Sequence, residues 1–337
     1  MNCRILATLG PSSLRQDIIS QIENEYLYLF RINLSHTPID SLADIISKIQ
    51  SYTEIPICLD SEGAQIRNQS VTNGKIFLHK DDAIKIHFNE ILGDSKNLSF
   101  TPPNIAEQLT VGDEMSIDFN STRIKIIEKH MKYCKAKVEH GGKVGSNKAA
   151  TLNREIDMEA ITSKDKKAIT IAKEMGIKYF ALSFAGSSED VKTMRELAGR
   201  DATIISKIES KKGVLNLNDI IDASDEILID RGDLSREINL EKIPFLQRRI
   251  IAMARSKKVP VYVATNLLES MVKVPEPTRA EINDVVSTLL MGANGLVLAA
   301  ETAIGKYPVK AAKMIKKLIS QTEKWTSNTS ITELLES

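Results

Sequence analysis

The chain has 337 residues, 42% of them hydrophobic, and its 45 lysines and arginines are balanced by 44 aspartates and glutamates. This length allows one large domain with a smaller one, and a net charge of +1 excludes a broad basic surface for nucleic acid. The three cysteines are widely separated and no run of about 18 apolar residues exists to span a bilayer, so we expect a soluble, cytoplasmic protein without a disulfide framework.

Short apolar runs rich in β-branched residues recur along the chain. They cover residues 4–9, 26–32, 57–59, 179–183, 203–206, 226–229, 259–263 and 295–298. Segments with helical spacing lie between most of these runs, for example 41–51, 163–175, 188–197, 246–256, 281–291 and 309–321. Strands that alternate with amphipathic helices indicate a parallel sheet, and eight strands are the number that a closed (β/α)₈ barrel needs.

One interval interrupts this alternation, between the third and fourth runs. It shows no long helical pattern and instead offers short alternating runs, at 83–88, 114–118, 123–127 and 134–138. Alternation with period two is typical of strands with one buried face. The interval therefore indicates a small all-β domain.

These patterns predict the domain organisation. We expect residues 1–67 and 149–322 to form the barrel, 68–148 to form the inserted β-rich domain and 323–337 to form a polar tail. An insert after a barrel strand lies on the face that carries the active site, which favours a lid. A decorative or oligomerising insert is the alternative.

Compact clusters of opposite charge follow two of the predicted strands. Lys207 and Glu209 follow the fifth run, and Asp233 follows the sixth. Because parallel strands end at one edge of the sheet, we expect these side chains to meet where α/β enzymes keep their chemistry. A carboxylate pair suits a hard cation such as Mg²⁺, and the lysine could neutralise a phosphoryl group or an enolate oxygen. A structural salt bridge at the sheet rim is the alternative.

Eight longer motifs occur in the order in which one enzyme family carries them. They are ATLGPSS (7–13), FRINLSH (30–36), LDSEG (59–63), SKIE (206–209), RGDL (231–234), ATNLLESM (264–271), PTRAE (277–281) and ETA (301–303). From about residue 4 to about residue 319 the chain resembles pyruvate kinases. The resemblance implies a (β/α)₈ TIM barrel with an inserted small β-barrel lid domain, which agrees with the organisation predicted above.

The resemblance also implies a reaction, phosphoryl transfer between phosphoenolpyruvate and ADP that yields pyruvate and ATP. By family position, Glu209 and Asp233 would hold a divalent cation, Mg²⁺ or Mn²⁺. Lys207 would stabilise the phosphoryl group in flight and the enolate left behind. Arg31 would bind the transferred phosphate through its planar guanidinium, for which lysine is a poor replacement.

Further residues take roles by the same resemblance. The backbone N–H groups of Gly232 and Asp233, at the start of a short helix, would receive the substrate carboxylate. Thr265 would lie near the methylene carbon, in the relay that delivers a proton to the enolate. Without the family match, an ordinary strand-end hydroxyl bonded to backbone would be the better interpretation of Thr265.

Two other groups of residues match ligand contacts of the family. The monovalent-cation ligands, all oxygen donors as K⁺ requires, would be Asn33, Ser35, Asp60 and Ser61. The nucleotide or phosphate contacts would be His36, Arg67 and Lys148. A lone histidine at a strand end is otherwise more often structural.

The sequence departs from the family pattern near these groups. Glu62 stands where the family has a lysine, and Gln65 replaces the glutamate associated with K⁺ dependence. The small residue before Arg-Gly-Asp is Asp230. Its extra carboxylate could repel a phosphate or compete for the metal; alternatively it pairs with Arg231 or Arg236 and changes little.

The family's carboxyl-terminal α/β domain has no counterpart after about residue 321, so we expect no control by sugar phosphates through it, and a homo-oligomer is possible. Two other functions remain open at this stage. One is a repurposed homologue that acts on another 2-oxo acid or phosphoryl acceptor. The other is a catalytically silent ligand-binding protein.

Overall fold

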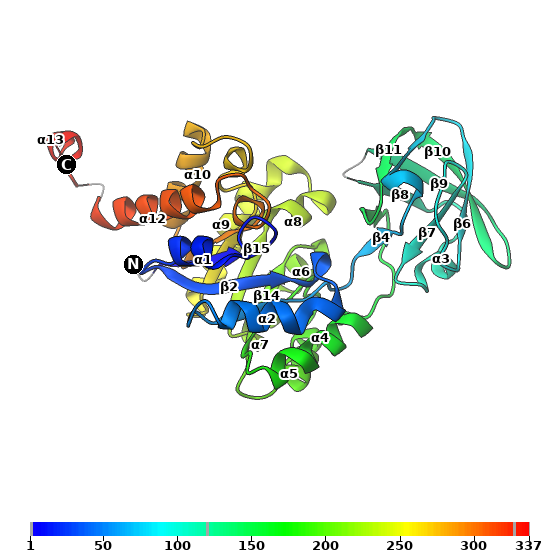
Figure 1. The fold of residues 1–337 in the computed structure, drawn as a ribbon. Coiled ribbons are helices and arrows are strands. Elements are labelled where there is room, and N and C mark those ends of the chain that lie inside the picture. The colour runs from blue at the N-terminus through cyan, green and yellow to red at the C-terminus, as the bar shows by residue number, and fades with distance from the viewer. Residues whose placement is uncertain (1–2, 119–120, 326–327, 337) are drawn as a thin grey trace. The chain divides into compact units, whose positions relative to one another are not determined.

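The computed structural model describes residues 3–118, 121–325 and 328–336, and it contains both helices and strands (Figure 1). The chain forms two compact units, which we call the large unit (Met1–Gly63 with Ala160–Ser337) and the small unit (Ala64–Glu159). The small unit is wider than the 68–148 expected for the insert, because strands on both sides of that interval pair with each other inside it.

Eight parallel strands close into a barrel in the large unit. They are β1 (Arg4–Thr8), β2 (Leu27–Asn33), β3 (Ile57–Asp60), β13 (Tyr179–Leu182), β14 (Thr203–Ile208), β15 (Glu226–Asp230), β16 (Val261–Ala264) and β17 (Gly295–Leu298). Each strand pairs with its neighbours in this order, and β1 also pairs with β17 to close the sheet. Each strand overlaps one of the eight predicted runs, so the predicted (β/α)₈ barrel is confirmed.

Helices surround these strands (Figure 1). The α-helices of the large unit are α1 (Gln16–Ile22), α2 (Leu42–Gln50), α4 (Ser163–Glu174), α5 (Ser188–Ala198), α6 (Lys211–Leu215), α7 (Leu217–Ala223), α8 (Arg231–Glu237), α9 (Ile243–Ser256), α10 (Arg279–Leu290), α11 (Ala300–Ala303), α12 (Pro308–Lys324) and α13 (Ile331–Glu336). Short 3₁₀ turns are η1 (Leu34–His36), η2 (Ile39–Ser41), η4 (Leu240–Lys242) and η5 (Glu269–Val272). Both α4 and α10 begin with a capping box, in which a threonine hydroxyl and an acid satisfy each other's backbone N–H groups.

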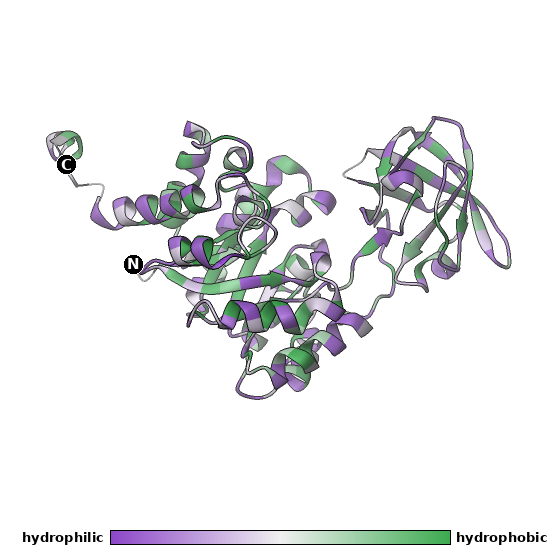
Figure 2. Ribbon diagram, viewed as in Figure 1, coloured by the Kyte–Doolittle hydropathy of each residue, from purple (hydrophilic) through white to green (hydrophobic). Residues whose placement is uncertain are grey.

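The large unit has its core in two layers, because successive side chains of a strand point to opposite faces. One set packs between the sheet and the helices, and Figure 2 shows the apolar colour on the strands and on one side of helices such as α12. The other set fills the inside of the barrel; it includes Leu6, Leu29, Ile205, Leu228 and Tyr262. The barrel is therefore solid, and chemistry is possible only at its ends.

A polar aromatic cluster closes the amino end of the barrel. Arg4 Nη1 donates to Glu226 Oε1 at 3.0 Å and to the Tyr262 hydroxyl at 3.1 Å. The Tyr28 hydroxyl donates to the same Glu226 oxygen at 3.2 Å. Burial raises the pKa of Glu226, and the hydrogen bonds from Tyr262 and Tyr28 and the charge of Arg4 oppose this shift. Glu226 Oε1 is satisfied by Arg4 and Tyr28, whereas Oε2 has no hydrogen-bond partner among the described residues.

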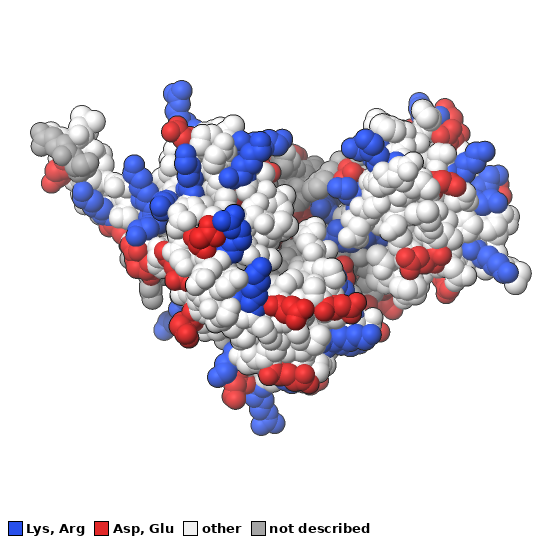
Figure 3. Space-filling view, in the orientation of Figure 1, with Lys and Arg blue, Asp and Glu red and all other residues white. Residues whose placement is uncertain are grey.

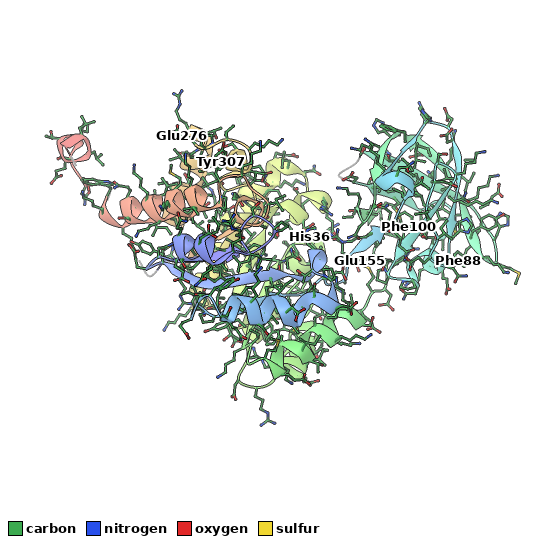
Figure 4. All side chains as sticks on the ribbon, viewed as in Figure 1. His36, Phe88, Phe100, Glu155, Glu276 and Tyr307 are labelled. Carbon is green, nitrogen blue, oxygen red and sulfur yellow. The ribbon has the colours of Figure 1, made fainter. Side chains whose placement is uncertain are left out.

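The small unit is a second closed barrel. Its strands, in spatial order, are β10 (Tyr133–His140), β6 (Ala83–His87), β7 (Asn97–Thr101), β4 (Ile66–Asn68), β12 (Ala149–Leu152), β8 (Glu114–Ile117) and β9 (Thr122–Lys129). A separate hairpin-like pair consists of β5 (Lys75–Leu78) and β11 (Gly142–Gly145), and the helical segments are η3 (Thr72–Gly74) and α3 (Ile105–Gln108). Phe100, labelled in Figure 4, is buried in the core of this unit. The predicted small β-barrel is thus confirmed.

The surface shows no region of a single charge sign on the face drawn in Figure 3, where basic and acidic side chains are interspersed. Within the described residues, no helix has both the length and the apolar composition that crossing a membrane requires.

Candidate active site

A buried cluster of charged side chains lies at the carboxyl end of the large barrel. Five neighbouring strands, from β2 to β15, supply it from residues at or near their carboxyl ends. Its members are Arg31, Asp60, Ser183, Lys207, Glu209 and Asp230. Parallel strands deliver these residues to one edge, as the sequence predicted for Lys207 and Glu209.

Arg31 is held by residues of β1 and β3, the two strands that flank β2. Its Nη1 lies 2.8 Å from Asp60 Oδ2, and its Nε donates to Thr8 Oγ1 at 2.9 Å. The Thr8 hydroxyl in turn donates to the carbonyl of Leu298 at 2.8 Å. Among the described residues, none accepts a hydrogen bond from Arg31 Nη2. The guanidinium is therefore fixed in a plane with one nitrogen left for a ligand, although the residue is only 3% exposed.

Lys207 occupies the centre of the cluster. Its Nζ donates to Ser183 Oγ at 2.9 Å and lies 3.2 Å from Asp60 Oδ1 and 3.3 Å from Glu209 Oε2. Burial alone would lower the pKa of Lys207, but the surrounding carboxylates outweigh it and raise that pKa above its usual value. The ammonium group thus stays charged although it is 5% exposed.

Ser183 is a member of this cluster that the sequence analysis did not identify. Its hydroxyl donates to the Ser61 carbonyl at 2.6 Å and approaches Asp60 Oδ1 at 3.2 Å, and it accepts from Lys207. The signal that could have found it is its position, directly after the fourth predicted strand at the same edge. It links the third strand to the fifth and positions the ammonium group.

Glu209 is buried, and only one of its two carboxylate oxygens accepts a hydrogen bond. Its Oε1 accepts from the Phe184 backbone N–H at 2.7 Å. In the part of the chain that the structure describes, Oε2 receives no hydrogen bond and has only the ion pair with Lys207. Burial raises the pKa of Glu209 to about 8; Lys207 opposes the shift, and Asp233 and Asp230 add to it. A carboxylate in this state gains stability from a nearby cation.

Three carboxylates are placed to hold such a cation. Glu209, Asp230 and Asp233 each offer one oxygen, and these oxygens all lie within 4.8 Å of one another. Asp233 also pairs with Arg236, whose Nε lies 3.2 Å from Oδ1. Hard divalent cations prefer carboxylate oxygens. The donor set and the unsatisfied oxygen of Glu209 therefore fit Mg²⁺ or Mn²⁺, with Asp230 as a member that the sequence analysis treated only as a departure.

Asp230 is not neutralised in the way the sequence suggested. It pairs with neither Arg231, which contacts Asp284 at 2.7 Å, nor Arg236. Instead, its Oδ1 accepts from the Thr265 hydroxyl at 2.7 Å and from the N–H groups of Gly232 and Asp233 at 3.1 and 3.5 Å.

The local charges set the ionisation of Asp230. Burial alone would raise its pKa, but the charge of Lys207 and the Thr265 hydrogen bond outweigh burial and lower that pKa below its usual value. Asp230 is therefore an ionised carboxylate, and it accepts from the same donors that the resemblance assigns to a substrate carboxylate.

The turn that carries Thr265 is strained. Thr265 and Asn266 both adopt positive φ, at 74° and 57°, which is costly for residues with a Cβ. Arg231 holds this turn, since its Nε and Nη2 donate to the Thr265 carbonyl at 3.1 and 2.6 Å. A Cβ on Gly232 would come within 2.8 Å of Thr265 Cγ2, so only glycine fits there without a shift. Thr265, Gly232 and Asp230 thus form one tightly packed group.

The residues expected to bind K⁺ lie at the ends of β2 and β3, where Asn33 and Asp60 are partners in register. Asn33 Oδ1 accepts from the Ser35 N–H at 2.9 Å, and the Ser61 carbonyl accepts from Ser183. Asp60 already faces two cationic side chains. The four residues are near one another along these strand ends, and their role as K⁺ ligands stays a prediction.

A lysine lies beside Glu62, although the family lysine is missing from that position. Lys164 Nζ, from α4, lies 3.8 Å from Glu62 Oε2 and donates to the Leu34 carbonyl at 2.6 Å. The turn itself is held by Asp165, which accepts from the N–H groups of Glu62 and Gly63 at 2.7 and 3.1 Å. A positive charge is therefore present here, supplied by another element.

The residues expected to contact the nucleotide belong to both units. In the large unit, His36 ends η1 and is exposed (Figure 4). In the small unit, Arg67 Nη1 donates to the Asn147 carbonyl at 3.2 Å, and the Lys148 backbone N–H donates to Asn68 Oδ1 at 2.9 Å. The nucleotide role of all three stays a prediction, as does the lid role of the small unit.

Comparison with known proteins gives one consistent match. The family model described as "Pyruvate kinase, barrel domain" matches residues 1–312. The chain is 32% identical over 330 residues to the pyruvate kinase of Thermotoga maritima, covering 95% of this chain and 71% of that protein. It is 32% identical over 332 residues to that of Geobacillus stearothermophilus, at 95% and 57% coverage. It is 30% identical over 329 residues to that of Mycobacterium tuberculosis, at 95% and 70%. The chain thus spans between 57% and 71% of the length of these relatives.

Proposed function

The chain belongs to the pyruvate kinase family, a family of phosphotransferases, and we propose on this basis that it transfers a phosphoryl group between phosphoenolpyruvate and ADP, giving pyruvate and ATP. The observation that carries the proposal is the convergence of Arg31, Lys207 and Glu209 in one buried cluster with Asp233 beside it. These are the residues that such a reaction needs, at the barrel end where this fold carries chemistry.

Lys207 supplies fixed positive charge for the transfer. The transition state of phosphoryl transfer is loose and metaphosphate-like, so it needs preorganised charge more than covalent help. Ser183, Asp60 and Glu209 hold the ammonium group from three sides. It stabilises the phosphoryl oxygens in flight and then the enolate oxygen of pyruvate.

Arg31 orients the phosphoryl group. Its contacts with Thr8 and Asp60 lock the guanidinium plane, and Nη2 is the nitrogen that donates to a phosphoryl oxygen. A rigid planar donor loses little conformational entropy on binding. Arg31 therefore fixes the orientation of the phosphoryl group during transfer.

Glu209 and Asp233 hold the divalent cation, Mg²⁺ or Mn²⁺, with Asp230 close by. When bound, the cation neutralises negative charge on the substrate and on the phosphoryl group. Asn33, Ser35, Asp60 and Ser61 form the site for a monovalent cation, K⁺, under the same proposal. His36, Arg67 and Lys148 contact the nucleotide.

Thr265 supports the proton-transfer half of the reaction. Enolpyruvate becomes pyruvate when its methylene carbon gains a proton, and the Thr265 hydroxyl belongs to the relay that delivers it. The small unit acts as the lid that excludes water from the site.

A coupled assay tests this function. Purified protein is given phosphoenolpyruvate, ADP and Mg²⁺ or Mn²⁺, with and without K⁺, and pyruvate is detected through lactate dehydrogenase. We expect turnover that requires the divalent cation and that Lys207→Met abolishes. Absence of turnover in pure protein that still binds oxalate, a planar mimic of the enolate, would refute the proposed function.

A further inference from the structure

The side chain of Asp230 occupies hydrogen-bond donors that the proposed function assigns to the substrate. It is the last residue of β15 and its side chain caps the first turn of α8. One oxygen, Oδ1, accepts from the Thr265 hydroxyl and from the N–H groups of Gly232 and Asp233. Under the proposed function, the two N–H groups are the donors that receive the carboxylate of the substrate.

We infer that Asp230 lowers the affinity of this site for carboxylate ligands, because its side chain competes with the ligand carboxylate for these donors. The inference rests on the proposed function for the identity of the ligand. The new element is that the Asp230 side chain occupies the place where the ligand carboxylate would bind.

The donors are already occupied by Asp230. Each N–H and each hydroxyl has one hydrogen to donate. A substrate carboxylate that uses the N–H groups of Gly232 and Asp233 must therefore displace Asp230 Oδ1 from both. A displaced and buried carboxylate without new partners is costly, because Asp230 is only 9% exposed.

The surroundings of the donors are also negatively charged. Oxygens of Asp230, Glu209 and Asp233 lie within 4.8 Å of one another, so a ligand carboxylate at this place enters a field that is already negative. Like charges at such distances disfavour each other unless a cation lies between them. Asp230 thus adds a negative charge that a bound cation must offset before a ligand carboxylate binds at this place.

The donors are also held by contacts that do not involve Asp230. Arg231 holds the Thr265 carbonyl with two hydrogen bonds, and its Nη1 is anchored by Asp284 at 2.7 Å. The close approach of Gly232 to Thr265 fixes the start of α8. Removal of the Asp230 carboxylate should therefore release the donors with their geometry kept, so that a ligand carboxylate binds in its place.

The test is the affinity of oxalate for protein saturated with Mn²⁺, measured by isothermal titration calorimetry. The variants are Asp230→Ala, which removes the carboxylate, and Asp230→Asn, which keeps an acceptor oxygen but removes the charge. We expect oxalate to bind at least tenfold more tightly to Asp230→Ala than to the wild type, with Asp230→Asn between the two. Mn²⁺ affinity is measured separately, because Asp230 lies beside the cation site.

A matched control comes from the small unit. Asp94 Oδ1 also accepts two backbone N–H groups, those of Lys96 and Asn97 at 2.7 and 2.8 Å, and is remote from the barrel chemistry in sequence and unit. Asp94→Ala should leave oxalate affinity unchanged. In active protein, Asp230→Ala should lower KM for phosphoenolpyruvate while KM for ADP stays the same, which a merely structural role would not produce.

Unchanged or weaker oxalate binding by folded Asp230→Ala at saturating Mn²⁺ overturns the inference. If that variant fails to fold, oxalate affinity is measured in Asp230→Asn instead, and an affinity equal to that of the wild type overturns the inference. The two proposals fail separately. Turnover by the wild type with no gain in Asp230→Ala refutes only the inference. A gain in oxalate affinity with no turnover by the wild type refutes only the proposed function.

Discussion

The two units are both closed barrels, yet among the described residues only the large unit has ion pairs in which both side chains are buried. In the large unit, the ion pairs of Lys207 with Asp60 and Glu209 join side chains that are at most 6% exposed. In the small unit, the pairs of Lys125 with Glu114 and Lys137 with Asp81 join side chains that are at least 36% exposed. Buried charge is costly and is retained where it serves chemistry, whereas exposed pairs contribute little. The difference supports the proposal that the carboxyl end of the large barrel is the functional site.

The strongest test of this comparison is the same substitution in both units. Lys207→Met should lower kcat by about a thousandfold or more, since it removes preorganised charge from the transition state. Lys125→Met should leave kcat within about twofold, because its charge is exposed. Both are measured in the coupled assay with Mg²⁺ present, and far-UV circular dichroism verifies that each variant is folded. Near-normal turnover of Lys207→Met would remove the basis of the proposed mechanism.

The next prediction concerns the shape of the Arg31 side chain and not its charge. Arg31→Lys keeps the positive charge but loses the planar fork that contacts Thr8 and Asp60. We expect kcat/KM for phosphoenolpyruvate to fall by about a hundredfold, by analogy with loss of one preorganised donor. KM for ADP is the internal control. A variant with full activity would show that charge alone is sufficient at this position.

Divalent cations should stabilise the large unit selectively. A cation at one hundred times its Kd adds about 2.7 kcal/mol to the stability of the state that binds it. Mn²⁺ should therefore raise the Tm of the large unit, and Glu209→Gln should abolish most of this shift. Hydrogen exchange resolves the two units, and equal protection of both by Mn²⁺ would contradict a site confined to the barrel.

One ion pair of the small unit departs from the surface pattern and gives a stability test. Asp113, 5% exposed, accepts from Arg154 Nε and Nη2 at 2.8 and 2.9 Å and from the Thr110 N–H at 2.8 Å. Asp113→Asn should destabilise the small unit by about 1–3 kcal/mol at pH 7, measured by urea unfolding. Catalysis should be affected far less than by Lys207→Met.

The pH dependence of Asp113 follows from its ionisation. Burial alone would raise its pKa, but the Arg154 and Thr110 hydrogen bonds outweigh burial and lower it. A folded-state pKa below the unfolded value means that the stabilisation is present above about pH 4 and is lost as the pH falls through the folded-state pKa. The gap between wild type and Asp113→Asn should therefore close in strongly acidic buffer; a gap that persists there would rule out this ion pair as its cause.

The smallest expected effect belongs to an exposed pair. Glu114→Gln removes the partner of Lys125, and both side chains are more than a third exposed. We expect a loss of at most about 0.5 kcal/mol, which vanishes at high salt. A larger loss in urea unfolding would weaken the distinction between the two units.

Much of the fold was predictable from the sequence because the barrel strands are buried on both faces. Such strands must be continuous apolar runs, and Ile227–Ile229 is a run of this kind in β15. The long helices were predictable from their apolar period, as for α12. Short helices such as α6 and α7 were missed, since five to seven residues are too few to show a period. In the small unit, β7 was missed because its Asn97 and Ser99 weaken the alternation.

The site was predictable in outline for a topological reason and unpredictable in its hydrogen bonds. Parallel strands share an edge, so Lys207 and Glu209 had to meet the end of β15. Nothing in the sequence pattern fixes a rotamer, and the bonds of Ser183 to Lys207 and of Asp230 to Thr265 depend on neighbours from other strands. Asp230 showed this most clearly, because the sequence offered Arg231 and Arg236 as partners and the structure pairs it with neither.

The pairing that closes the large barrel has a consequence for how the protein is made. β1 pairs with β17 from Arg4↔Gly295 to Ala7↔Leu298. One edge of the first strand therefore stays unpaired until the last strand has been synthesised. The small unit, by contrast, is one continuous stretch that ends at Glu159. Since domains fold as units during synthesis, we expect the insert to become protease-resistant on ribosome-stalled chains well before the barrel around it does.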